Sequence, residues 1–111
     1  MGDGRHWTPI ELLAAALSGC LLHASLDVAR HSKVDLRHWH DRVTLTLGSD
    51  DRPGLRVTAA EVVVSVGVAG NTRPERVERI VHKAHKLCTV ARSLAVPVTL
   101  TVRVQDVPGD C

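Results

Sequence analysis

Residues 8–30 read TPIELLAAALSGCLLHASLDVAR, and this segment is apolar on most faces of a helix. It opens with a capping signature, in which Thr8 can cap the helix, Pro9 suits the first helical position and Glu11 stands three residues after the cap. A helix that is apolar nearly all round is normally buried. In so short a chain we expect the helix at residues 12–30 to be central, covered by a sheet or by a second subunit.

Strands are predicted to follow this helix. Residues 43–47 alternate strictly between apolar and polar side chains, and turn residues at 48–54 separate them from a second run between Val57 and Val68. Residues 98–105 alternate again, which predicts a half-buried final strand.

A second helix is predicted between the second and the last strand. Residues 72–75 repeat the capping signature, and apolar residues then recur at helical spacing from Val77 to Leu87, opposite a charged face. Cys88 stands at the end of this half-exposed helix. The order helix, strand, strand, helix, strand predicts one α+β domain over residues 1–111, with both helices packed on an antiparallel sheet.

Composition narrows the classes of function. Of the 111 residues 44% are hydrophobic but only 2% aromatic, so the core must be aliphatic, and a short chain with small core residues favours oligomerisation. The net charge of +2 is scattered, which disfavours a nucleic-acid partner. The apolar run at residues 12–22 is too short to span a bilayer and lacks the basic flank of a signal peptide. We therefore expect a cytoplasmic protein with no membrane partner.

Three cysteines, Cys20, Cys88 and Cys111, are the candidate reactive groups. An odd number argues against a secreted disulfide scaffold and raises the weight of redox, catalytic or metal roles, although free cysteines are also commonly buried. Cys20 follows Gly19 inside the apolar helix, where a glycine costs about 1 kcal/mol relative to alanine. This suggests a close approach to the backbone at Gly19, or simply a packed thiol at a helix crossing.

Two segments resemble motifs of the OsmC and Ohr family of thiol-dependent peroxidases. Residues 8–20, TPIELLAAALSGC, look like the family's P-E-E-L-L-x-A-A-L-A-G-C, and residues 84–92, AHKLCTVAR, resemble its A-H-x-x-C-P-V-S-R. Residues 96–100 fit the family's last strand, and the element order also fits. The resemblance covers essentially the whole chain from Gly2 and implies an OsmC-like fold in an intertwined homodimer.

The resemblance also implies a mechanism. By position, Cys20 resembles the peroxidatic residue, whose thiolate attacks the peroxide bond and becomes a sulfenic acid. Cys88 resembles the resolving residue, which forms a disulfide with it that a dithiol or lipoyl reductant then clears. The implied substrates are organic hydroperoxides and the implied role is defence against oxidative stress; no cofactor is expected.

The sequence departs from the family pattern near the first cysteine. The family normally carries strands before the central helix, and on them an arginine that lowers the thiol pKa, whereas this sequence begins at the loop before the helix, as an N-terminally shortened member would. Arg5 or Arg92 could substitute for that arginine. Glu11 matches only the second acidic position of the family, where helix capping also explains it, and Ile10 occupies the first. Thr89 stands in place of the proline after the resolving cysteine.

Two other interpretations stay open. Cys20 and His23 stand three residues apart, as do His85 and Cys88, so these four side chains could form a tetrahedral zinc site if the two helices met. Alternatively, the chain is a degenerate relative that acts as a dimeric binding or scaffold protein. His31 is interpreted as a helix-end residue.

Overall fold

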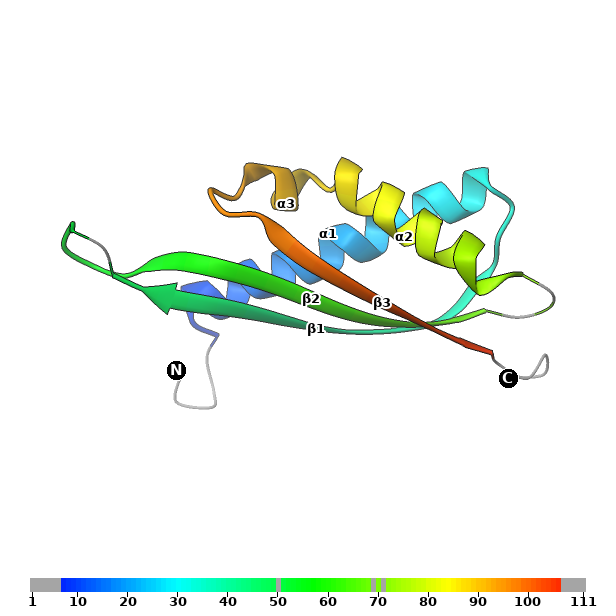
Figure 1. The fold of residues 1–111 in the computed structure, drawn as a ribbon, viewed down its shortest axis with the longest axis horizontal. Helices are drawn as coiled ribbons and strands as arrows, with labels where there is room; N and C mark the ends of the chain where they lie inside the picture. The colour runs from blue at the N-terminus through cyan, green and yellow to red at the C-terminus, as the bar shows by residue number, and fades with distance from the viewer. Residues whose placement is uncertain (1–6, 50, 69, 71, 107–111) are drawn as a thin grey trace.

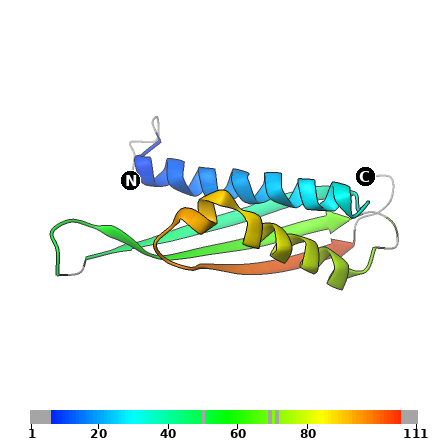
Figure 2. The same ribbon diagram turned by 90° about the horizontal axis from the view of Figure 1, so that it is seen from above.

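The computed structural model describes residues 7–49, 51–68, 70 and 72–106. The elements in chain order are α1 (Pro9–His31), β1 (Leu36–Gly48), β2 (Arg56–Val68), α2 (Pro74–Leu87), α3 (Thr89–Ser93) and β3 (Val98–Asp106). Figures 1 and 2 show α1 and α2 side by side on one face of the three-stranded sheet, whose other face carries no helix from the described part of the chain. The predicted order is confirmed, with the short α3 added after α2.

The start of α1 follows the predicted local chemistry. Thr8 Oγ1 accepts a hydrogen bond from the Glu11 N–H at 3.2 Å, and Glu11 Oε1 accepts one from the Thr8 N–H at 2.9 Å. This reciprocal pair satisfies two backbone donors that the helix leaves without partners. The same signature at residues 72–75 was misleading, because Arg73 caps α2 and makes no side-chain capping bond.

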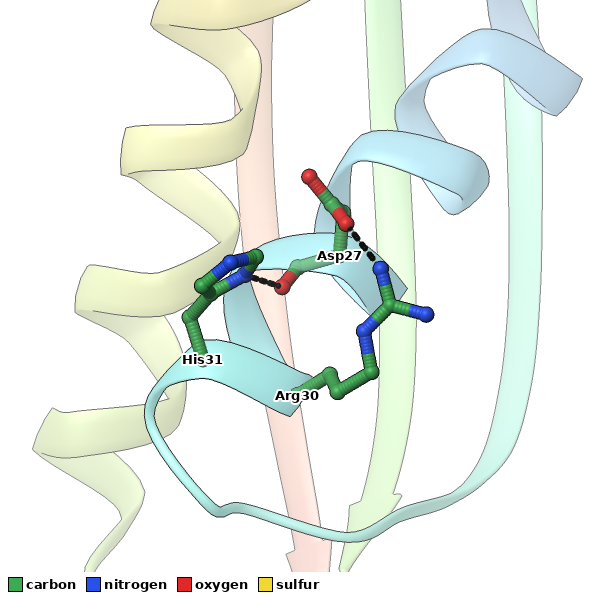
Figure 3. Close-up of polar contacts among 3 residues, drawn as sticks. All are labelled: Asp27, Arg30 and His31. Atoms are coloured by element: carbon green, nitrogen blue, oxygen red, sulfur yellow. Dashed lines mark hydrogen bonds and ion pairs between the residues drawn. The ribbon is translucent and has the colours of Figure 1, made fainter.

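Polar contacts stabilise the last turn of α1 (Figure 3). Arg30 pairs with the Asp27 carboxylate, and Nδ1 of His31 lies 2.8 Å from the Asp27 carbonyl oxygen. Basic side chains here interact favourably with the negative end of the helix dipole. His31 is the last residue of α1, as predicted, and Lys33, with φ of 58°, then turns the chain toward β1.

The sheet has the order β1-β2-β3 and is mixed rather than wholly antiparallel, which corrects the prediction. β1 and β2 are antiparallel, whereas β3 runs parallel to β2. The chain between β2 and β3 passes through α2 and α3, and a crossover of this kind is what a parallel pair requires. β1 also begins at Leu36, well before the predicted start at residue 43.

The core is aliphatic, as the composition requires. Alternate residues of β2 face the two helices and are almost fully buried, and each such valine contributes about 1.5–3 kcal/mol of transfer free energy. The aliphatic side chains of the core that are fully buried come from α1, β2 and α2, and include Leu17, Leu21, Val62, Val64, Val66, Val77 and Val81.

α1 is less covered than its sequence predicts. Its buried residues are Leu17, Leu21, Ser25, Val28 and Ala29, while Leu12 is 57% and Leu26 47% exposed. By length and composition α1 could also cross a membrane, which the run at residues 12–22 did not indicate. In the folded chain its buried side packs on α2, β1 and α3. The described residues therefore cover only one side of this helix.

Candidate active site

The two predicted cysteines lie together where α1 meets the junction of α2 and α3. Cys20 is half-buried on α1, and Cys88 is fully buried between Leu87, the end of α2, and Thr89, the start of α3. The two thiols lie close enough that Cys88 lowers the pKa of Cys20 and Cys20 raises the pKa of Cys88, and both cysteines are free. Residues far apart in the sequence thus form one pair of thiols.

Backbone amides favour the thiolate of Cys20. The N–H of Val90 hydrogen-bonds the Cys20 sulfur and is the main reason that the pKa of this thiol lies below its ordinary value, against the opposing effect of burial. The Cys88 thiol and the N–H of Thr89 add to the lowering. Hydrogen bonds to the charged form of an acid lower its pKa, and the first N–H groups of a helix have no partner within it.

Cys88 has the opposite electrostatics. Burial is the main cause that raises the pKa of the Cys88 thiol, and its hydrogen bond to Cys20 raises it further, against the opposing N–H of Ala91. The proton of the pair therefore stays on Cys88 while Cys20 ionises. Two identical side chains in contact acquire different reactivity, because the thiolate is the nucleophile.

The proposed supporting residues are not grouped around the sulfurs. Arg92 lies exposed on α3, and its backbone N–H donates to the Cys88 carbonyl at 3.0 Å, but its guanidinium is not among the groups that lower the pKa of Cys20. Glu11 is engaged with Thr8, whose backbone N–H and hydroxyl lower the pKa of this carboxyl. Arg5 lies outside the described residues.

Sequence reasoning missed the amides of Val90 and Thr89. The only signal was the position of Cys88 directly before residues 89–93, which form the helix α3 that the periodicity does not predict. The predicted close approach at Gly19 is not made by the described residues, because none of their heavy atoms outside the adjoining turns of α1 lies within 4 Å of a Cβ built there.

A polar link beside Cys20 was also missed. The hydroxyl of Ser18 on α1 donates to the Asp41 carboxylate of β1, with oxygen distances of 2.7 and 2.9 Å, and Nε1 of Trp39 donates to the same carboxylate at 2.7 Å. Hydrogen bonds to a charged acceptor are the stronger kind. This link holds the stretch of α1 that carries Cys20 on the sheet.

The histidines do not complete a metal site with the cysteines. Over the part of the chain that the structure describes, no group of three or more His, Cys, Asp or Glu side chains could hold a metal ion. His23 is exposed, and the pKa of His85 is lowered first by burial and then by the neighbouring charge of His82. The structure therefore brings Cys20 and Cys88 together without His23 and His85.

The long helix and the second helix on one face of a small mixed sheet, with a cysteine pair where they meet, define an α+β domain of OsmC type. Residues 2–103 match the family model of the OsmC-like proteins, and the chain belongs to that family.

Known proteins share this architecture over most of the chain. An organic hydroperoxide resistance protein-like protein of Staphylococcus aureus is 27% identical over 106 residues, which are 94% of this chain and 74% of that protein. An OsmC-like protein of unknown function from Vibrio cholerae superposes with a TM-score of 0.76 at 26% identity, over 85% of this chain and 62% of that one. The organic hydroperoxide resistance protein OsmC of Legionella pneumophila has the same fold, with a TM-score of 0.68 at 22% identity over 94% of this chain and 73% of its own. This chain therefore spans less than two thirds of the Vibrio protein.

Proposed function

We propose that this protein reduces organic hydroperoxides in defence against oxidative stress, with Cys20 as the peroxidatic residue and Cys88 as the resolving residue. The observation that carries the proposal is the close approach of the two thiols, which lowers the pKa of Cys20 and raises the pKa of Cys88. The name of the Staphylococcus relative supports the class of substrate.

The chemistry needs only these two sulfurs and an external reductant. The Cys20 thiolate attacks one oxygen of the peroxide, the O–O bond breaks, and the remaining oxygen takes up a proton and leaves as the alcohol, so that Cys20 becomes a sulfenic acid. The Cys88 sulfur then attacks the Cys20 sulfur, and its proton leaves with the hydroxyl as water. A dithiol of the lipoyl type reduces the resulting disulfide by exchange. Hydroperoxide and dithiol thus become alcohol, water and an oxidised dithiol.

Backbone N–H groups stabilise the Cys20 thiolate in place of a nearby arginine side chain. The N–H groups of Val90 and Thr89 lie at the start of a helix and are held by its backbone, so they need no reorganisation when the thiolate forms. Preorganised donors of this kind stabilise negative charge more effectively than mobile ones. This arrangement supports activity without Arg5 or Arg92.

We also propose that the protein acts as a homodimer in the cytosol. Leu12 and Leu26 leave an apolar strip of α1 exposed, and contiguous exposed apolar surface marks interaction sites on small soluble domains. A second copy of the chain would cover this side of α1, next to Cys20. A reducing cytosol keeps both thiols free between turnovers.

A peroxide-consumption assay tests the assignment of the cysteines. With an organic hydroperoxide and a lipoyl dithiol, we expect turnover by the wild type and by Cys111→Ser, and none by Cys20→Ser. Cys88→Ser should consume hydroperoxide once for each protein chain and then stop, because the sulfenic acid finds no resolving thiol.

Mass spectrometry of the oxidised wild type provides the second readout, and we expect a disulfide between Cys20 and Cys88. Equal rates for the wild type and Cys20→Ser would eliminate the catalytic assignment and leave a binding or scaffold role.

A further inference from the structure

The face of the sheet opposite the helices has a hollow lined by basic side chains. This cavity of about 220 Å³ lies over all three strands and is lined by His40, Arg42, Val63, Ser65 and Arg103. Figure 2 shows that α1 and α2 are both on the other side of the sheet. The hollow is therefore separate from the cysteine pair, which lies among the helices.

Strand pairing holds these side chains in place. His40 of β1 pairs with Ser65 of β2, and Ser65 pairs with Arg103 of β3, so the three form one row across the sheet. Arg42 lies opposite Val63 in the next row on the same face, because alternate residues of a strand share a face. Side chains in adjacent rows are within reach of each other when they are long.

The basic side chains of the hollow have no ion-pair partner among the described residues. Neither Arg42 nor Arg103 forms an ion pair with a described residue, and no carboxylate lines the cavity. Glu61 is on the same face of β2 but pairs with Thr44, one row further along and outside the lining. Two guanidinium groups that share a hollow without a carboxylate create a positive potential that attracts anions.

We propose that this hollow binds the phosphate group of a small phosphorylated ligand. The planar forks of Arg42 and Arg103 match phosphate oxygens, which a guanidinium binds through two parallel hydrogen bonds. The hydroxyl of Ser65 and the ring of His40 offer further donors, and Val63 offers an apolar contact to the rest of the ligand.

The size and the charge of the hollow fit this ligand. Its volume is several times the roughly 30 Å³ that one water molecule occupies, so it accommodates a group of several heavy atoms. Two copies of the chain that faced each other here would bring their arginines together, and like charges oppose such an interface. A small anion is therefore favoured over a second copy.

Titration of inorganic phosphate into the full chain, followed by the amide resonances of Ser65 and Arg103, tests the proposal. We expect saturable binding with a Kd on the order of 1 mM. Arg42→Gln and Arg103→Gln should each weaken it by about tenfold, since each removes charge-assisted hydrogen bonds. The matched control Arg79→Gln removes an equal charge from an exposed basic surface of α2 and should leave the Kd unchanged.

An additional variant and a second anion test whether the resonance shifts come from phosphate bound in the hollow. Ser65→Asp places a carboxylate in the hollow and should abolish binding, while circular dichroism verifies the fold. Absence of saturation in the wild type, equal loss in Arg79→Gln, or equal binding of acetate would each overturn the proposal. Peroxide consumption should be unchanged in all of these variants, so the result is independent of the proposed peroxidase function.

Discussion

The two long helices lie on the same face of the sheet, yet the chain buries them to different extents. α2 is amphipathic, and its apolar residues Val77, Val81 and Ala84 are fully buried while its charged residues face outward. α1 is apolar on nearly all sides, but only one side is buried and Leu12 is 57% exposed. The described residues bury most of the apolar face of α2, whereas α1 carries more apolar surface than these residues cover.

Substitutions on the buried side of α1 should destabilise the chain most. Leu21 is 1% exposed, and Leu21→Ala should lower the free energy of unfolding by about 2–5 kcal/mol, because it leaves a cavity between the helix and the core. Urea denaturation measures this loss. Leu87→Ala on α2, where the side chain is 55% exposed, is the control and should change stability by less than about 0.5 kcal/mol. A small effect at Leu21 would mean that α1 is not anchored as described.

Substitutions on the exposed side of α1 should weaken dimerisation and leave the stability of the folded chain nearly unchanged. Leu12→Gln is expected to weaken the proposed homodimer by about tenfold or more, because an interface loses a well-packed apolar contact. Light scattering after size-exclusion chromatography over a range of concentrations measures the dissociation constant. Leu87→Gln changes an equally exposed leucine on α2 and should leave it unaltered. A wild type that is monomeric at all concentrations would contradict the proposed dimer.

The capping residues of α1 and α2 should also differ in their contribution to stability, by a smaller amount. Thr8→Ala should cost about 1 kcal/mol, because it removes the acceptor for the Glu11 N–H at the start of α1. Arg73→Ala at the start of α2 should cost much less, since Arg73 makes no capping bond with its side chain. Thermal unfolding of the two variants measures the difference, and equal losses would show that the capping box contributes little.

The last comparison, with the most direct bearing on function, concerns ionisation of the two thiols. The pKa of Cys20 is lowered from 9.0 and that of Cys88 is raised, so alkylation of Cys20 should rise with pH at lower pH than alkylation of Cys88. Cys88→Ala removes the thiol donor and should move the Cys20 profile to higher pH, whereas Cys88→Ser keeps a hydroxyl donor and should move it less. Mass spectrometry of each modified cysteine over a pH series gives the profiles. Identical profiles for both thiols would contradict the described hydrogen bonds.

The same reasoning explains which parts of the fold were predictable. The capping box of Thr8 and the helical spacing of α2 involve residues within a few positions of each other, so the sequence predicts them correctly. The direction of β3 and the early start of β1 at Leu36 depend on pairing with β2, which local periodicity does not contain. The signature at residues 72–75 predicts the start of α2 but not its cap, because the chain enters this helix through Arg73.

The order of the elements, the aliphatic core and the choice of the two cysteines follow from composition, periodicity and motif spacing, which are read directly from the amino-acid order. Packing of the helices places Cys20 against Cys88 and brings the amides of Val90 and Thr89 to its sulfur, and no local pattern predicts this. Strand pairing likewise places Arg42 and Arg103, which lie on two different strands, around one hollow. Thiol pKa values and charge clusters depend on distances through space, and those distances are set by how the helices and strands pack.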